Sequence, residues 1–443
     1  MWLKGQRQAR RVTADSGPSE ALVGAAYDIG SQRHGLLFGI FCLWVLSLPF
    51  YRYSVVATYS IDNLLAPFLC LSAVFLPRLR DQAIVVRRVQ ILWAMLALYT
   101  LYGIAVLAKF AASPVFPREA VWNIVRDSFY FFAPALYIRD LRTLRIMKKL
   151  IVVVAVIGGL SAFLVALGVI RLPVERFAES RIGEGWLPKS IGLFSSYGDL
   201  SILYGFVAVL MVSHGREALG FLGSRVGKLG VWLALLLGLA GSQSRNMLFG
   251  TILALCAYWG WRRLQTATGK QRNAIIGLFL AGMVVLPGIM VAFGSDIVER
   301  ISQMGGERAE HTAVERLESY SQALALLAVE PLGVSYETYR KWQPLIEHIH
   351  NMWLRLLLQG GPLAVAGVAG LIWLAFKGGS KQAAPPLLPV EPPLIIGAIV
   401  ALFIAVEFYG GISSTMWLML GTLISFNWVR MNSSTASPKD SAP

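Results

Sequence analysis

Residues 347–361 read EHIHNMWLRLLLQGG and close a long polar interval that starts at Gly294. This interval is the only long polar one between two apolar stretches, and it contains three of the five histidines in the chain. Apolar stretches of about 15 to 22 residues can cross a bilayer. The polar interval between two such stretches is therefore expected to form a large loop outside the membrane. We expect any chemistry to take place in this loop, with most of the remaining chain acting as a membrane scaffold.

The composition is that of a membrane protein. Of the 443 residues, 56% are hydrophobic and 15% charged, and the mean hydropathy is +0.59. This is more apolar surface than a soluble domain can bury. The apolar stretches are continuous rather than alternating, which favours helices over a barrel because each spanning helix satisfies its own backbone hydrogen bonds. The sequence therefore predicts an all-α, polytopic membrane protein.

About twelve membrane-spanning helices are predicted, with both termini on the same side. The expected spans are 35–50, 61–77, 89–112, 121–138, 150–170, 197–214, 227–241, 246–261, 274–293, 361–376, 394–409 and 413–430.

These spans divide the chain into five parts. Residues 1–34 form a polar cytoplasmic tail, 35–293 hold spans one to nine, and 294–360 form the helical periplasmic loop between spans nine and ten. Residues 361–430 hold spans ten to twelve, and the Ser- and Pro-rich residues 431–443 are expected to be a disordered cytoplasmic tail.

The distribution of basic residues predicts the orientation. Of the lysines and arginines, 25 lie on the side of the amino terminus and 13 on the other side. The richer side is expected to be cytoplasmic, which places both termini inside the cell and the long loop on the outer side of the membrane. The net charge of +15 comes from short clusters beside apolar stretches. This pattern is typical of topology signals and argues against a nucleic-acid partner.

Two helices are predicted inside the loop. Thr312 and Glu315 fit a capping box, so a helix is expected to open near Thr312 and to run to Val329, where Glu330 and Pro331 stop it. Residues 331–333 then turn the chain. Asn351 can cap a second helix from Met352, which Gly360 and Gly361 end before the tenth span.

Arg245 is the strongest candidate for binding an anion. It follows Ser242 and Ser244 in a tight turn, 241–246, at the start of the eighth span. A helix start favours negative charge, and a planar guanidinium suits a phosphate or diphosphate. An arginine that only marks topology is the alternative, although an outward arginine runs against the positive-inside bias.

Other basic and polar groups are weaker candidates. Arg316 falls in the first turns of the predicted loop helix, where Glu315 and Glu318 offer it ion pairs on an exposed face. Arg181 and Lys189, in the outer loop before the sixth span, either widen an anion-binding face or meet lipid headgroups. Ser244 and Asn351 are secondary candidates beside the main groups. Arg126 and Asp127 form either an internal pair or a cavity site within the fourth span.

His348 and His350 stand two residues apart, just before the second loop helix. A histidine near a helix start stays neutral and can accept a proton from a hydroxyl group, a role that favours His350. A structural histidine is one alternative. A metal site is another, but zinc needs a further ligand, and the loop offers only His311, Glu347 and unpatterned carboxylates. No metal and no cofactor are predicted.

Taken in order, these motifs resemble the O-antigen ligase and polymerase superfamily. The resemblance rests on a Ser-Arg turn (Ser244 and Arg245), an Arg-x-x-x-aromatic pattern (Arg316 to Tyr320), an acid-Pro-Leu-Gly turn (330–333) and His-Asn-x-x-Leu…Gly (350–360). It is best over residues 227–376.

The resemblance implies a metal-independent, inverting glycosyltransferase of the bacterial inner membrane. Such an enzyme takes a glycan from an undecaprenyl diphosphate carrier at the periplasmic face. A ligase passes the glycan to lipid A-core in lipopolysaccharide biosynthesis, whereas a polymerase passes it to another lipid-linked repeat. The family's diphosphate-binding arginines fall on Arg245 and Arg316, and its catalytic histidine falls on His350. Ligation is the favoured prediction, a polymerase of O-antigen or exopolysaccharide is the alternative, and a polysaccharide transporter is less favoured.

Overall fold

The structure is a computed structural model. The described residues are 35–48, 54–56, 59–60, 65, 69, 82–111, 130–138, 141–170, 190–194, 197–242, 244–266, 268–269, 271, 307–349, 351–377 and 414–435.

Helices account for nearly all of these residues, which confirms the all-α prediction. In chain order they are α3 (Gly35–Leu46), α5 (Gln82–Ala111), α7 (Leu141–Ala166), α8 (Tyr197–Ser213), α9 (Arg216–Leu219), the 3-10 turn η4 (Gly220–Gly223), α10 (Arg225–Ser242), α11 (Arg245–Thr266), α13 (Glu307–Val329), α14 (Tyr336–His348), α15 (Met352–Lys377) and α17 (Ser414–Thr435), with a further helical segment at 130–137. One short antiparallel hairpin, β1 (Ser54–Val56) with β2 (Tyr59–Ser60), lies between α3 and α5 and was not predicted.

Three helices in the described part of the chain are long and apolar enough to cross a membrane. Their candidate spans are Arg142–Ala166, Arg225–Ser242 and Met352–Ala375. Together with the shorter apolar helices, they make this a multi-pass membrane protein. The predicted spans 274–293 and 394–409 lie outside the described residues, as does 61–77 apart from Leu65 and Leu69. The count of twelve spans therefore stays a prediction.

Two helices begin earlier than hydropathy predicted. Helix α5 starts at Gln82 rather than near residue 89, and α7 starts at Leu141 rather than near 150. The added turns contain Arg87 and Arg88 in α5 and Lys148 and Lys149 in α7. Arginine and lysine are good helix formers, so the helix continues into basic turns that an apolar window leaves out.

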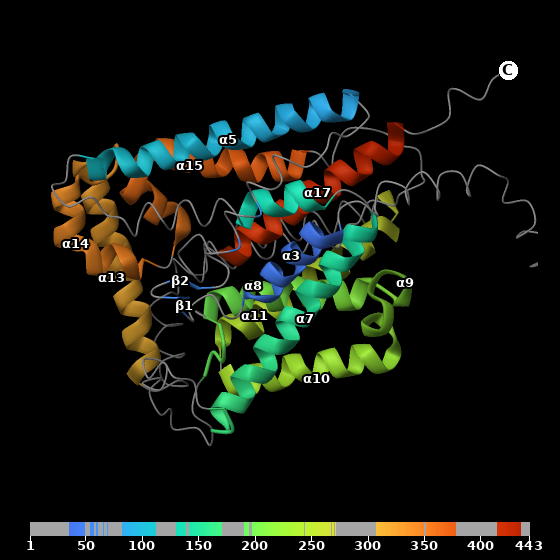
Figure 1. The fold of residues 1–443 in the computed structure, drawn as a ribbon. Coiled ribbons are helices and arrows are strands. Elements are labelled where there is room, and N and C mark those ends of the chain that lie inside the picture. Colours follow the sequence, from blue (N-terminus) through green and yellow to red (C-terminus); the bar gives the residue numbers. More distant parts are fainter. Residues whose placement is uncertain are drawn as a thin grey trace, which may run out of the picture.

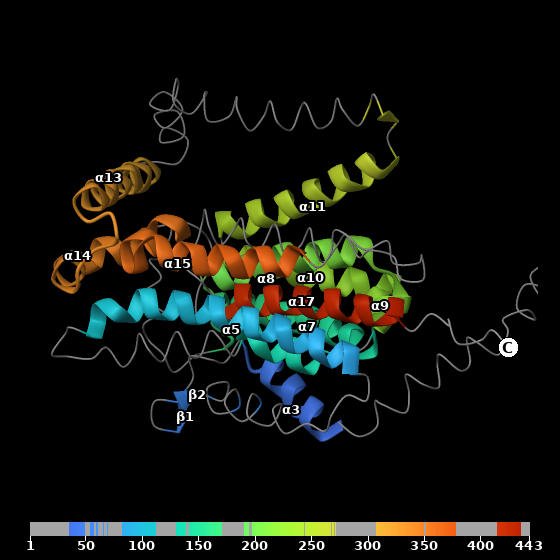
Figure 2. The same cartoon turned by 90° about the horizontal axis from the view of Figure 1, so that it is seen from above.

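The helices form an elongated bundle with two distinct ends. The carboxyl ends of α5, α7 and α10 and the amino ends of α8, α11, α15 and α17 gather at one end, on the left in Figures 1 and 2. The opposite ends of these helices, together with α9, lie on the right (Figure 1). Helices α13 and α14 belong to the left end. These are the ends that the sequence predicts to face outward, although the side of the membrane itself stays a prediction.

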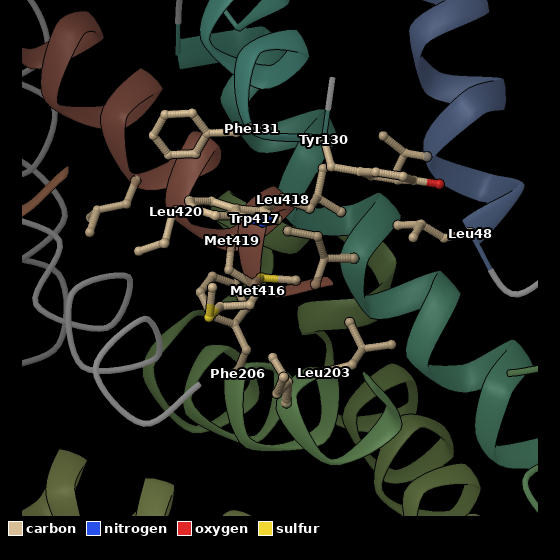
Figure 3. Packing of buried hydrophobic residues seen from close by; sticks show 14 of the residues in the cluster. Leu48, Tyr130, Phe131, Leu203, Phe206, Met416, Trp417, Leu418, Met419 and Leu420 are labelled. Atoms are coloured by element: carbon tan, nitrogen blue, oxygen red, sulfur yellow. The ribbon is translucent and has the colours of Figure 1, made fainter. Parts of the chain in front are cut away.

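Helices α8 and α17 lie in the interior. Every described side chain from Met416 to Phe426 is buried, and so is every residue from Leu200 to Met211. Figure 3 shows Trp417 among buried side chains from several helices, and its ring meets that of Phe131 edge-on with centroids 5.1 Å apart. Both helices are apolar on all sides, as is typical of a helix with no face toward water.

Two buried hydroxyl groups on α17 are satisfied within the helix. Thr422 donates to the carbonyl of Leu418 at 2.8 Å, and Ser425 donates to that of Gly421 at 2.7 Å. Such bonds to the preceding turn let a hydroxyl group sit in an apolar interior without a partner on another helix. The hydroxyl groups therefore mark no binding site along this part of α17.

Small residues allow α7, α8 and α10 to pack closely. A Cβ atom at Gly238 of α10 would meet the Tyr204 hydroxyl and would lie 2.5 Å from the Cα of Gly159. A Cβ atom at Gly159 would likewise meet Tyr204 and would lie 2.6 Å from the carbonyl oxygen of Ala234. The two glycines thus form the contact between α7 and α10, as is common between membrane helices.

Replacing Gly238 with alanine should destabilise the protein. The added methyl group overlaps backbone and a buried ring that cannot retreat, and overpacking of this kind costs about 1–3 kcal/mol. Thermal unfolding in detergent should show a lower Tm for Gly238→Ala. Gly230, on the same helix, has nothing within 4 Å of its Cβ position, so Gly230→Ala is the matched control and should leave Tm unchanged or slightly higher. Equal Tm values for both variants would contradict the packing.

A buried basic pair lies at the opposite end of the bundle from α13. Lys148 is 1% exposed, and its Nζ lies 3.1 Å from Nε2 of His214. Ser213 donates to the carbonyl of Val209 at 2.6 Å, so its oxygen is left to accept from Nδ1 of His214 at 2.7 Å. Both ring nitrogens of His214 therefore have a polar neighbour, Ser213 on one side and Lys148 on the other. The contact ties the start of α7 to the end of α8.

Candidate functional site

Helices α13 and α14 and the start of α15 form a unit with its own small core. Its buried members come from all three helices and the connections between them: Ala323, Val334, Ile346, Ile349 and Leu358. Tyr320 and Trp342 pack against this core. Tyr339 packs against both this core and the main one, which fixes the unit to the bundle. The polar loop predicted from the sequence is therefore a folded helical unit in the residues described.

Glu330 organises the turn between α13 and α14. Its carboxylate accepts hydrogen bonds from the backbone N–H of Ser335 and, at 2.6 Å, from the hydroxyl of Thr338. Ser335 is the N-cap of α14 and accepts from the backbone N–H of Thr338. The acid of the acid-Pro-Leu-Gly motif therefore holds the start of a helix, where negative charge is favourable.

Replacing Glu330 with alanine should loosen α14. The loss of an N-terminal cap costs about 0.5–2 kcal/mol, and charge-assisted hydrogen bonds are at the strong end of that range. Hydrogen–deuterium exchange should become faster at the first amides of α14. Glu318→Ala removes an exposed carboxylate from α13 and is the control. Equal exchange in both variants would show that Glu330 does not hold the turn.

The turn itself docks on the break in α15. Gly333 has φ of 95° and donates to the carbonyl of Glu330 at 2.9 Å, and the next N–H, that of Val334, donates to the carbonyl of Leu358 at 2.9 Å. At Gly361 the helix breaks with φ of 65°, and a Cβ atom there would collide with the Leu332 carbonyl. Two motifs thirty residues apart are thus one structural contact, and the predicted helix end at 360–361 is confirmed.

Asn351 caps α15 as predicted. Its side-chain oxygen accepts from the backbone N–H of Leu354 at 3.0 Å, and its carbonyl accepts from that of Arg355. Ile349, two residues earlier, is buried in the core of the unit. His350 stands between these two anchored residues in the sequence and itself lies outside the described residues.

Two predictions about this region were wrong. Helix α13 begins at Glu307, so Thr312 lies inside the helix rather than at its start. The capping-box pattern fits locally, but the preceding charged residues are good helix formers and carry the helix further. His348 was placed in a non-helical stretch but is the last residue of α14. The end of α13 at Val329 is confirmed.

Arg245 is the first residue of α11, as predicted, and its side chain lies outside the described part. Ser244 precedes it and is the N-cap, since its hydroxyl oxygen accepts from the backbone N–H of Met247 at 3.4 Å. Ser242 and Ser244 are both buried, so the turn is recessed within the protein. The structure gives Ser244 a clear local role, which is to fix where α11 begins.

A second segment covers this turn. The backbone N–H of Ser190 donates to the carbonyl of Gly241 at 2.9 Å, and that of Leu193 donates to the Ser161 hydroxyl at 3.2 Å. Gly192 has φ of 59° and packs against the backbone of Ala162, where a side chain would collide. Sequence reasoning missed this contact because it joins residues far apart in the chain. It brings the residues that follow Lys189 to the end of α10, four residues before α11 begins.

The structure describes the backbone at some of the candidate positions and not at others. The start of α11 and the unit formed by α13, α14 and the start of α15 lie at the same end of the bundle (Figures 1 and 2). Arg316 lies on α13, one turn before Tyr320 and two before Ala323, which pack in the unit's core. Its side chain and that of His348 lie outside the described part, as do Arg126, Asp127, Arg181 and Lys189 altogether. Contacts among Arg245, Arg316 and His350 therefore stay a prediction.

The metal alternative is equally untested. In the described part of the chain, no group of three or more histidine, cysteine, aspartate or glutamate side chains is suited to hold a metal ion. The side chains of His348 and Glu347 and the whole of His350 fall outside that search.

The fold and the loop unit define a multi-pass membrane protein with a helical unit docked across one end of its bundle. Residues 229–369 match the family model described as O-antigen ligase. This match confirms, over these residues, the resemblance predicted from the sequence. The family indicates a glycan-transferring ligase or polymerase. No curated protein and no solved structure matches the chain.

Proposed function

We propose that this protein is a metal-independent, inverting glycosyltransferase of the bacterial inner membrane. It moves a glycan from an undecaprenyl diphosphate carrier to an acceptor sugar hydroxyl at the periplasmic face, and the favoured reaction is ligation of O-antigen to lipid A-core. One observation carries the proposal: the family match spans Arg245, Arg316 and His350 together, and the described backbone nearest these positions lies at one end of the bundle.

The reaction breaks the bond between the sugar C1 and the diphosphate oxygen. The diphosphate leaves with the bonding electrons, and its growing negative charge needs stabilisation. We assign this role to Arg245 and Arg316, since one guanidinium group can donate two parallel hydrogen bonds to the oxygens of a phosphate. The acceptor oxygen attacks C1 from the opposite face, which inverts the configuration, and its proton passes to His350 acting as a general base.

Neighbouring residues are assigned supporting roles. Ser244 caps α11 and Asn351 caps α15, so each holds the backbone beside a reacting residue. Arg181 and Lys189 are proposed to widen the anionic binding face. The bond between Ser190 and Gly241 supports this for Lys189, because it holds the adjoining residue beside the end of α10, four residues before Arg245. His348 is kept as the alternative base.

Polymerisation on the same scaffold is the second candidate, because the same family match and the same chemistry support it. A ligase and a polymerase differ only in the acceptor, which is a lipid A-core sugar for one and a second carrier-linked repeat for the other. A transporter is less favoured, since the candidate charged residues are predicted on one face rather than along a path through the bundle.

The test is glycan transfer by the purified protein in lipid nanodiscs. Carrier-linked glycan is supplied with lipid A-core or with more carrier-linked glycan, and each mixture is run with and without EDTA. We expect transfer to lipid A-core at a rate that EDTA leaves unchanged. Chain growth on the carrier alone would favour the polymerase, and loss of activity in EDTA would overturn metal independence. No transfer to either acceptor would refute the proposed function.

A further inference from the structure

The second half of α13 exposes an apolar face. Leu324 is 60% exposed, Val329 is 80% exposed, and Leu332, in the following turn, is 78% exposed. Ala325 and Ala328 share this face. Residues 319–329 contain no charged side chain. A helix face in water normally carries charged side chains, so this face is unusual for a surface that meets only solvent.

The opposite face of the same turns is already occupied. Ala323 is buried in the core of the loop unit, and Leu326 and Leu327 pack against that core. The exposed apolar side chains are therefore not part of the core that holds the unit together. They form a second apolar face on one short helix, and that face requires an apolar partner.

Two contacts place the start of this face beside α15 and α5. Leu332 abuts Gly361 at the break in α15, and the Cβ position of Gly360 lies 3.0 Å from a methyl carbon of Val106 on α5. Val106 belongs to the apolar stretch Trp93–Val106, and both glycines lie inside the span Met352–Ala375. The exposed face thus begins beside the apolar segments of two membrane helices.

The surface of α15 at this level is itself apolar and open. Leu363, two residues after the break, is 55% exposed, and Trp373 further along the span is 57% exposed. In a spanning helix such side chains face the hydrocarbon of the bilayer. The exposed face of α13 adjoins this lipid-facing surface through the contact between Leu332 and Gly361.

The direction of α13 suits a helix that lies in the plane of the membrane. In Figure 1 it runs across the end of the bundle, nearly at right angles to α5 and α15, and in Figure 2 it is seen almost end-on. Helices that bind a bilayer surface lie in its plane and bury one apolar face about 5–10 Å into the boundary region.

We propose that the second half of α13, together with Leu332, is an interfacial membrane anchor whose exposed face binds the acyl chains of bilayer lipids. The proposal rests on the fold and holds whichever glycan the protein transfers. It also has a consequence for the proposed function. Arg316 lies eight residues before Leu324, about 12 Å along the helix at 1.5 Å per residue. A helix parallel to the membrane would keep Arg316 near the depth of lipid phosphates.

Site-directed spin labelling of the full-length protein in lipid nanodiscs tests the anchor. The three native cysteines are replaced by serine, and single cysteines are introduced at Leu324, Val329 or Leu332 and labelled with a nitroxide. A label at Arg340, which is exposed on α14, is the control. Collision rates are measured with oxygen, which enters the bilayer, and with a nickel chelate, which stays in water.

We expect oxygen to exceed the nickel chelate at Leu324, Val329 and Leu332, and the opposite order at Arg340. All three test positions are exposed, so the substitutions should leave Tm within a few degrees of that of the cysteine-free protein, and each position gives an independent reading. A higher nickel rate at all three would place the face in water and overturn the proposal. Poor access for both reagents would show that protein covers the face, which would also overturn it. Either result leaves the glycan-transfer assay unaffected.

Discussion

Replacing His350 with alanine should abolish glycan transfer while the protein still inserts and folds. A general base contributes about 10²–10⁴-fold to the rate of the chemical step. The proposed reaction uses no metal ion, so no metal-bound group can take over the proton transfer when His350 is removed. The measurement is single-turnover transfer from carrier-linked glycan by purified protein. A fall of at least about 10²-fold is expected in the rate of transfer, with binding of the carrier little changed.

His34→Ala is the control, since His34 lies in the amino-terminal tail, which is predicted to be cytoplasmic. It should leave transfer unchanged. Yield and Tm of both variants should equal those of the parent, because a misfolded protein loses activity for another reason. Full activity in a well-folded His350→Ala protein would end the assignment of His350. A large loss in His348→Ala with none in His350→Ala would move the role to the alternative base.

Replacing Arg245 with lysine should lower transfer nearly as far as a change to alanine. Lysine keeps the charge but lacks the planar, paired donors that fit a diphosphate, and the loss of one donor to a developing anion costs about 10²–10³ in kcat. We expect kcat to fall by that factor in Arg245→Lys. KM for the carrier should rise less, because the charge on the leaving group grows in the transition state.

Arg263 provides the matched control on the same helix. It lies in the last turn of α11, at the opposite end of the bundle, and is exposed. Arg263→Lys should leave both kcat and KM unchanged. If Arg245→Lys is as active as Arg263→Lys, the charge of Arg245 matters only for topology, and the diphosphate must be stabilised by other groups.

Local signals in the sequence predicted the local features of the site. Asn351 before an apolar helical repeat predicted a cap, and paired glycines predicted the break at Gly361. The Ser-Arg turn predicted the start of α11 at Arg245. Each of these features depends on a few neighbouring residues whose backbone preferences are strong. They were therefore accessible without any knowledge of the fold.

Helix α14 was missed although its signal is present. Tyr339, Trp342, Ile346 and Ile349 recur at helical spacing and pack in or against the small core. Pro344 masks this signal, because proline removes a backbone donor within a helix and is therefore typical of a helix boundary. Burial of the apolar stripe outweighs that local cost, which is how tertiary packing commonly overrides propensity.

Contacts between distant segments lay beyond sequence reasoning. Nothing in the residues near Leu332 predicts that they meet Gly361, and nothing near Ser190 predicts a bond to Gly241. Such contacts depend on how the helices are arranged, which periodicity alone does not specify. They also explain the acid in the acid-Pro-Leu-Gly motif. The Glu330 carboxylate accepts from Thr338 and holds the turn that contacts α15 at Gly361.

The central claim is that two guanidinium groups and one imidazole meet around a lipid-linked diphosphate. A cryo-electron microscopy structure of the protein in a nanodisc with undecaprenyl diphosphate-linked glycan tests it most directly. We expect Arg245 and Arg316 within hydrogen-bond distance, about 3 Å, of the phosphate oxygens, and His350 beside the anomeric carbon on the face opposite the diphosphate. A diphosphate bound elsewhere, or His350 turned away from it by more than the length of the sugar diphosphate, would contradict the claim.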